Sequence, residues 1–280
     1  MNFGMMAYDG LTEETFALPA VEQPYLPGDK NFKPLFYLGL SNWTYKEAEA
    51  KKSKQFPKPG TLPFYANHFN GIELDSTHQE LPAEEAVNKW YKCVDTKDFV
   101  FCPKLYKGIT QGKVDIHKLG LTKDFINRMK GFKEKLGNSL LELNEDYSSV
   151  NKDALLKYLK ELPAGFPLSV EIRGKEWISD KYLFDSLVKE LHQLNKGLVI
   201  ADTPGRRDLV HMHLSNSTAF IRFSCRGDHE LDLFRIDQWK KQLQSWYLQG
   251  LDKCFFFLHI QEKSSEDDFI SYAKEVLKFG

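Results

Sequence analysis

The feature that most constrains this chain is a series of eight short apolar segments with strand character, separated by longer segments with helical spacing. The eight segments lie at Leu35–Leu40, Gly71–Asp75, Phe99–Pro103, Ser139–Leu143, Leu168–Ile172, Gly197–Ala201, Ala219–Phe223 and Cys254–Leu258. Amphipathic segments lie between or after them, at Ala83–Cys93, Thr122–Lys135, Lys152–Glu161, Asp180–Leu194, Asp237–Leu248 and Ser265–Leu277. Strands that alternate with helices indicate parallel strands joined by crossovers.

Eight such units within about 250 residues predict an α/β chain folded as a closed (β/α)8 barrel of the TIM-barrel type. An open, doubly wound sheet is the alternative. Such a sheet usually has a phosphate-binding glycine turn after its first strand, and Gly39-Leu40-Ser41-Asn42-Trp43 does not contain one. Residues 1–30 show no periodic pattern, so we expect an N-terminal extension over residues 1–30 and a single barrel domain over residues 31–280.

Charge and hydropathy limit the class of protein. Lys+Arg is 38 and Asp+Glu is 39, which excludes a polycation that binds nucleic acid through charge alone. The first residues contain no basic segment followed by an apolar run, and no stretch approaches the ~20 apolar residues of a membrane span. We therefore expect a cytoplasmic protein with no membrane partner, and its oligomeric state stays open.

Ionisable side chains interrupt the predicted strands or follow them directly. Glu73 and Asp75 are two residues apart and share one face of a strand, as do Glu171 and Arg173. The others are Lys104, Glu142, Asp202, Arg222 and His259. An unpaired ion against the helix layer is costly, so we expect these side chains to point into the barrel near its C-terminal end, where barrel enzymes carry out their chemistry.

Acid–base chemistry is one role for this group. A carboxylate near other carboxylates in a semi-buried site can have a raised pKa, which makes Glu73, Asp75 and Glu171 candidate catalytic residues. The alternative, of equal weight, is that Glu73 and Glu171 only neutralise Arg173 and Arg222 in a buried network.

Three other candidates have structural alternatives. Asp202 lies in Asp-Thr-Pro-Gly and suits a turn or cap almost as well as a site. His259 is more often a buried polar residue than a base. Trp43 suits either packing at the rim or stacking against a ligand.

The segments after the first and third strands are rich in lysine. They hold nine lysines and three acids: Lys46, Lys51, Lys52, Lys54, Lys58, Lys104, Lys107, Lys113 and Lys118 against Glu47, Glu49 and Asp115. A positive mouth on a nearly neutral protein suits an anionic ligand, although an ordinary solvated lysine-rich surface is the favoured alternative.

Together, the segments at the strand ends resemble the YecE-like family, the domain of unknown function numbered seventy-two. The resemblance runs from about Phe36 to about Lys278, through FYLGLSNWTY, FNGIELDSTHQELP, FVFCPKLYKGIT, LGNSLLELN, LSVEIRGKEW, VIADTPG and FIRFSCRG. The positions that match the family's motifs are Gly39, Ser41, Trp43, Glu73 to Thr77, Lys104, Glu171 to Arg173, Trp177, Asp202 to Pro204, Ile221 to Phe223 and Gly227. The resemblance implies a TIM-barrel-like fold with a pocket at the strand ends and no established reaction.

The chain departs from the family's pattern around the rim of this pocket. His78 and Gln79 replace the usual aromatic residues, and Glu142-Leu143-Asn144 replaces Gln-Leu-Pro. The His-Pro after Arg173 is absent, and Ile260 and Gln261 replace a pair of Asn residues. The resemblance therefore implies a divergent member with a conventional pocket floor.

We predict an enzyme, of hydrolase or lyase type, that acts on a small anionic substrate bearing a phosphate or a carboxylate. The predicted substrate-binding residues are Ser41, Trp43, Lys104, Glu142, Arg173, Asp202, Arg222, Arg226 and His259. No cofactor and no metal ligand are predicted, although an oxygen-rich Mg²⁺ or Mn²⁺ site stays open. The less favoured alternatives are a nucleic-acid-binding or nucleic-acid-processing barrel and a non-catalytic ligand-binding protein.

Overall fold

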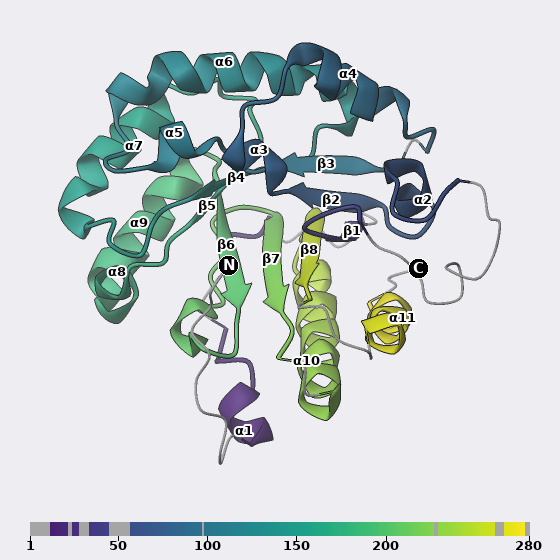
Figure 1. The fold of residues 1–280 in the computed structure, drawn as a ribbon. Coiled ribbons are helices and arrows are strands. Elements are labelled where there is room, and N and C mark those ends of the chain that lie inside the picture. Colours follow the sequence, from purple (N-terminus) through teal and green to yellow (C-terminus); the bar gives the residue numbers. More distant parts are fainter. Residues whose placement is uncertain are drawn as a thin grey trace.

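The structure is a computed structural model that describes residues 12–21, 24–27, 34–44, 57–96, 98–226, 229–260 and 266–277. Its strands are β1 (Leu35–Leu40), β2 (Gly71–Leu74), β3 (Val100–Pro103), β4 (Ser139–Glu142), β5 (Leu168–Glu171), β6 (Gly197–Asp202), β7 (Thr218–Ser224) and β8 (Lys253–His259). They form one eight-stranded sheet in the order β3-β2-β1-β8-β7-β6-β5-β4 (Figure 1). The ladders between neighbours in this order are parallel.

The two edges of this sheet meet between β3 and β4. Phe101 pairs with Leu136 and Lys104 with Leu140 through isolated parallel bridges. The amide of Leu105 also donates to the carbonyl of Leu140 at 2.9 Å. The sheet therefore curls into a nearly closed barrel, which confirms the predicted TIM-barrel-like fold over the open sheet.

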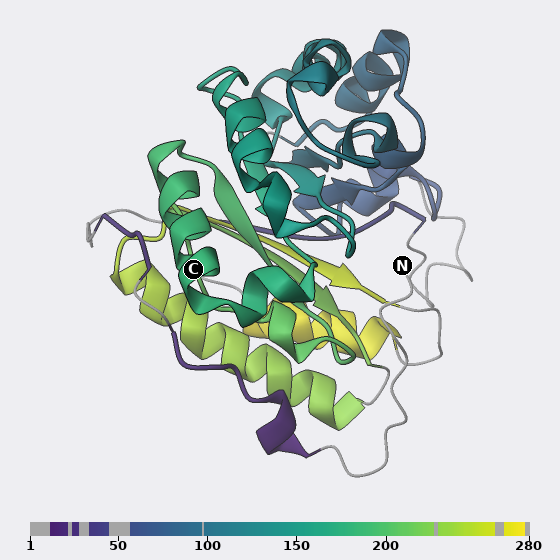
Figure 2. The same cartoon turned by 90° about the vertical axis from the view of Figure 1, so that its left-hand side faces the viewer.

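Helices lie around the outside of the strands (Figures 1 and 2). They are α1 (Glu13–Phe16), α2 (Leu62–Ala66), α3 (Ser76–Gln79), α4 (Glu84–Lys92), α5 (Lys107–Thr110), α6 (Leu119–Met129), α7 (Lys152–Lys160), α8 (Lys175–Ser179), α9 (Lys181–Gln193), α10 (His229–Leu248) and α11 (Glu266–Val276). The start of α9 follows from its sequence, because the carboxylate of Asp180 accepts a hydrogen bond from the amide of Leu183 at 3.0 Å.

Two connections differ from the sequence prediction. Helix α10 begins at His229, eight residues before the predicted start at Asp237. Between β6 and β7 the chain makes only a short 3₁₀ turn at Arg207–Leu209 within residues 203–217, so the strict alternation of strand and helix fails there. The stretch has Pro204 and Gly205 near its start and ends with Ser215, Asn216 and Ser217, residue types that favour turns and loops over a helix.

Close packing of β1 against β2 depends on glycine. Gly39 is paired with Gly71, and a Cβ atom on Gly39 would lie 1.9 Å from the Gly71 carbonyl oxygen. The hydroxyl of Tyr65 bridges the two strands, since it accepts from the Leu40 amide and donates to the Gly71 carbonyl, each at 2.7 Å. This bridge supports a ladder that spans only two residue pairs.

The interior of the barrel changes character along its axis. Its apolar part consists of Val100, Cys102, Leu140, Val199, Phe220, Phe255 and Phe257, with Tyr37 packed against them. Two residues further along their strands, the side chains on the same inward face become polar or ionised, as at Lys104 after Cys102 and Arg222 after Phe220. The fold thus gathers the strand-end charges at one end of an apolar cylinder.

Candidate functional site

Arg222 lies at the centre of the charged group at this end of the barrel. Its side chain is 1% exposed. The guanidinium binds Glu73 in a bidentate manner, with Nε donating to Oε2 at 3.0 Å and Nη2 to Oε1 at 2.8 Å. Its Nη1 donates to Glu171 Oε2 at 2.6 Å and to Glu142 Oε2 at 2.8 Å. One cation from β7 thereby joins carboxylates from β2, β4 and β5.

Two further cations extend this group towards the mouth of the barrel. Arg173 Nε donates to Glu171 Oε1 at 2.6 Å, and Arg173 Nη2 lies 3.1 Å from Glu142 Oε2. Lys104 Nζ lies 3.0 Å from the same Glu142 oxygen and 3.4 Å from Asp75 Oδ1.

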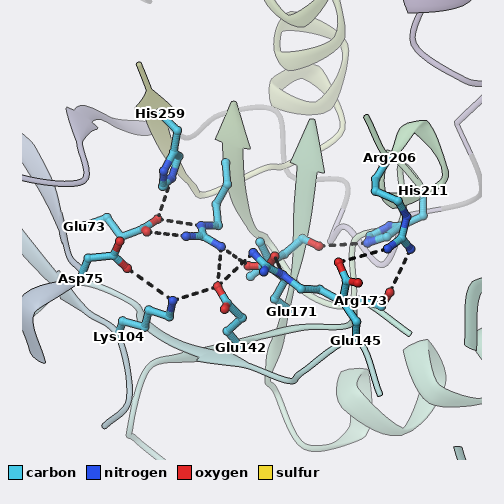
Figure 3. Close-up of polar contacts among 12 residues, drawn as sticks. Glu73, Asp75, Lys104, Glu142, Glu145, Glu171, Arg173, Arg206, His211 and His259 are labelled. Atoms are coloured by element: carbon cyan, nitrogen blue, oxygen red, sulfur yellow. Dashed lines mark hydrogen bonds and ion pairs between the residues drawn. The ribbon is translucent and has the colours of Figure 1, made fainter. Parts of the chain in front are cut away.

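His259 approaches Glu73 from β8, with its Nε2 3.4 Å from Glu73 Oε2. Figure 3 shows the side chains of these strand ends pointing towards one another. We call the eight residues the ionised network: Glu73, Asp75, Lys104, Glu142, Glu171, Arg173, Arg222 and His259. The structure thus brings together all three predicted catalytic residues and five of the nine predicted substrate-binding residues.

Burial and charge act in opposite directions on the carboxylates of the network. Burial raises the pKa of Glu73, but the interactions with Arg222 and His259 outweigh it and hold that pKa well below its usual range. Burial also raises the pKa of Glu171, and Arg173 and Arg222 outweigh it in the same way. Both groups are therefore carboxylates at neutral pH, and the raised pKa that we expected for candidate acids is wrong for these two.

Exposure separates the floor of the network from its rim. The side chains of Glu73, Glu171 and Arg222 are at most 1% exposed, whereas that of Asp75 is 42% exposed. The rim also includes Glu142, Arg173 and His259, whose side chains are 11% to 12% exposed. A ligand entering from solvent would meet these rim groups first.

Ser41 and Trp43 follow β1 and are half-buried. The Trp43 ring contacts Trp90 of α4 edge-on, with 5.4 Å between ring centroids. This contact supports the packing interpretation of Trp43, and ligand contacts by either residue stay predictions.

Asp202 lies on the other side of the barrel wall. Its carboxylate accepts from Arg235 Nη2 and from Trp239 Nε1, each at 2.7 Å, and also from Arg207. Arg235 and Trp239 belong to α10, so Asp202 points outward to that helix and not into the ionised network. We call Asp202, Arg207, Asp232, Arg235 and Trp239 the Asp202 cluster.

Arg226 also belongs beside this cluster, because its amide donates to the carboxylate of Asp232 at 2.9 and 3.1 Å. The aromatic ring of Phe16, from the N-terminal helix α1, lies 5.3 to 5.7 Å from the guanidiniums of Arg207, Arg226 and Arg235. Sequence reasoning missed Arg235. The signal was the spacing of Asp232, Arg235 and Trp239, which share one helix face at positions i, i+3 and i+7.

The predicted positive mouth is tested only in part. Lys46, Lys51, Lys52 and Lys54 lie outside the described residues. Of the others, Lys118 Nζ donates to the Gly108 carbonyl at 2.8 Å, and Lys113 lies 4.0 Å from Asp115. An anion-attracting surface around the mouth stays a prediction.

Over the part of the chain that the structure describes, no group of three or more His, Cys, Asp and Glu side chains is placed to hold a metal ion. None of the helices in that part is long and apolar enough to cross a membrane.

Known proteins resemble this chain over most of its length. The profile of a family described as "Protein of unknown function DUF72" matches residues 37–278. The chain is 26% identical to the UPF0759 protein YecE of Escherichia coli (strain K12), over 87% of this chain and 93% of that protein. It is 22% identical to the UPF0759 protein YunF of Bacillus subtilis (strain 168), over 80% and 88%. A crystal structure of a DUF72 family protein from Enterococcus faecalis V583 superposes with a TM-score of 0.66 at 18% identity, covering 89% of this chain and 99% of that one.

Proposed function

The chain belongs to the DUF72 family, and we propose that it is an enzyme that carries out acid–base chemistry on a small anionic substrate at the mouth of its barrel. One observation carries the proposal. Eight ionisable side chains from six strands converge where the barrel opens, and four of them keep an exposed edge towards that opening. In TIM-barrel enzymes the reacting groups come from the ends of several strands on this same face.

Stability alone is a poor reason for such a network. Burying an ion pair removes two charges from water, and well-packed apolar side chains of similar size are often equally or more stabilising. Phe220, Phe255 and Phe257 already fill the apolar part of this interior, so apolar side chains could equally fill the end that now holds the ionised network. A network that stability does not require is better explained by a polar ligand.

The exposed rim determines the roles that we propose. Asp75 is the general base, because its carboxylate is the most exposed in the network. Lys104 and Arg173 bind the anionic group of the substrate. The carboxylates of Glu73 and Glu171 have a lowered pKa and cannot donate a proton at neutral pH. We therefore assign them the role of holding Arg222 and Arg173 in place.

A turnover screen tests the proposal. The purified protein is offered phosphorylated and carboxylated metabolites, and the hydrolysis or elimination products are followed by mass spectrometry. For any substrate found, the variant D75N is expected to lower kcat by about a hundredfold to ten-thousandfold, the usual contribution of a positioned acid or base.

Asp208 offers a matched control. Its side chain is 36% exposed and is bound by Arg206 Nη2 at 2.6 Å, so D208N removes a comparable carboxylate outside the network. D208N should leave kcat within about threefold of the original protein. A D75N variant with full activity would refute the role of Asp75. Tight binding of an anionic metabolite without turnover would instead favour a non-catalytic ligand-binding protein.

A further inference from the structure

The side chain of Glu142 is surrounded by cations in an unusual way. Its single oxygen Oε2 lies 3.0 Å from Lys104 Nζ, 3.1 Å from Arg173 Nη2 and 2.8 Å from Arg222 Nη1. These cations come from three different strand ends, and all three point at one position. Three converging charged donors form a preorganised site for one oxygen of an anion.

The charge balance of the network bears on how a substrate anion could bind there. Its carboxylates are Glu73, Asp75, Glu142 and Glu171, and its fixed cations are Lys104, Arg173 and Arg222. Four negative charges against three positive ones leave no excess of positive charge, and a protonated His259 would only restore neutrality. An added anion therefore gains little at this site as long as every carboxylate keeps its place.

Of the three carboxylates that Arg222 binds, Glu142 is the one best placed to leave. Its side chain is 12% exposed, whereas those of Glu73 and Glu171 are 0% and 1% exposed. Each of the latter two also accepts hydrogen bonds on both carboxylate oxygens, from Arg222 and, for Glu171, from Arg173. Glu142 stands at the last residue of β4, beside the mouth, and its three side-chain torsions allow the carboxylate to swing towards solvent.

We propose that the position of Glu142 Oε2 is the anion-binding position of the site, and that Glu142 fills it until the carboxylate or phosphate group of a ligand takes its place. Exchange of one anionic group for another keeps the three cations paired, so binding does not require a positively charged site. This inference rests on the proposed function in one respect, namely that the ligand is a small anion. It adds which oxygen the ligand replaces and which residue competes with it.

Anion affinity of charge-neutral variants tests the exchange. E142Q keeps the shape of the side chain but removes the competing charge, so it should bind an oxyanion at least about tenfold more tightly than the original protein. The affinity is measured by isothermal titration calorimetry with inorganic phosphate and, separately, with acetate, at constant ionic strength in chloride. The two probes distinguish a phosphate site from a carboxylate site.

Glu145 provides the matched control. It lies on the same rim, its side chain is 65% exposed, and it pairs with Arg206 at 3.4 Å and not with the three converging cations. E145Q makes the same change in net charge and should leave the affinity within about twofold of the original. Adding R173M to E142Q should abolish the gain, because it removes one of the three donors.

The outcomes separate this inference from the proposed function. A gain confined to E142Q supports the exchange even if no substrate is ever turned over. An equal gain in E145Q, or no gain in a folded E142Q, overturns it even if the protein proves to be an enzyme. Should E142Q not fold, E142D withdraws the carboxylate by one methylene group and is expected to raise the affinity as well; an unchanged affinity there would overturn the inference.

Discussion

Removal of the Arg222 guanidinium is the most informative single change to the ionised network. Arg222→Met keeps an unbranched side chain of similar length but leaves Glu73 and Glu171 buried without their shared partner. Loss of one member of a buried ion pair usually costs about 3–5 kcal/mol. Because domains are stable by about 5–15 kcal/mol, R222M should remain folded at neutral pH with much of its margin lost.

The pH dependence of stability should also change sign. In the original protein the pKa of Glu73 lies below that of the unfolded chain, so the unfolded state binds more protons and stability falls as pH drops below about 4.5. In R222M, of the two groups that lower this pKa, only His259 remains, 3.4 Å from Glu73. Burial then dominates and raises the pKa, so the folded state binds the extra proton and stability falls as pH rises from about 4.5 towards 7.

Urea unfolding followed by circular dichroism, at half-unit intervals from pH 3 to 8, measures both the loss of stability and the change in its pH dependence. One group that changes its protonation on unfolding contributes a slope of up to about 1.4 kcal/mol per pH unit. The double variant E73Q/R222M, which lacks the stranded carboxylate, should recover part of the stability and lose the inverted slope. R206M is the control, because Arg206 pairs with the exposed carboxylates of Asp208 and Glu145 and should keep the original profile.

The reasoning fails if R222M loses less than about 1 kcal/mol at pH 7 or follows a profile parallel to that of the original protein. Either result would mean that water or a rearranged cation solvates Glu73. The arrangement in the structure would then be one of several of similar free energy.

Three further predictions concern parts of the fold outside the ionised network. Burial, with a smaller effect of the neighbouring His213, lowers the pKa of His211 from 6.5 to about 3. Because the unfolded chain then takes up the proton at a higher pH than the folded protein, the free energy of unfolding should fall by up to about 2 kcal/mol between pH 6.5 and 5. Urea unfolding of H211Q should not show that fall. G39A should lower the free energy of unfolding by about 3 kcal/mol or more, because its Cβ meets the Gly71 carbonyl, and a normal urea midpoint would contradict this packing. F16A removes a fully buried ring and should cost about 3 kcal/mol while making the N-terminal segment cleavable under limited proteolysis; a resistant segment would show that Phe16 does not hold it in place.

Most of the barrel could be predicted from the sequence because parallel strands leave a strong signal. A strand covered on both faces is a nearly continuous apolar run, and all eight predicted runs overlap the observed strands. The helices that connect the strands were harder to predict. The first turns of α10 carry the buried charged residues Asp232 and Arg235, which do not fit a search for apolar periodicity.

The same continuity explains why Asp202 was placed on the wrong side of the wall. When both faces of a strand are apolar, the sequence contains no alternation that says which residues point inward. The register of β6 against β7 shows which residues point inward. Ala201 pairs with the inward Arg222, and Asp202 pairs with Phe223, whose ring stacks on Phe269 of α11, so Asp202 lies on the outward face.

An acid at the end of a barrel strand is therefore not by itself a sign of a site, because a cation on the covering helix can satisfy it equally well. Arg235 does so for Asp202, with both side chains fully buried and with a second aspartate, Asp232, bound to its Nη1 at 2.7 Å. What distinguishes the ionised network is the origin and exposure of its charges. They come from the strands themselves and pair across the barrel axis, and Asp75 and Glu142 keep a face towards solvent. A buried pair across the wall fastens a helix to the sheet, whereas charges that meet on the axis beside an open mouth can still exchange a partner for a ligand.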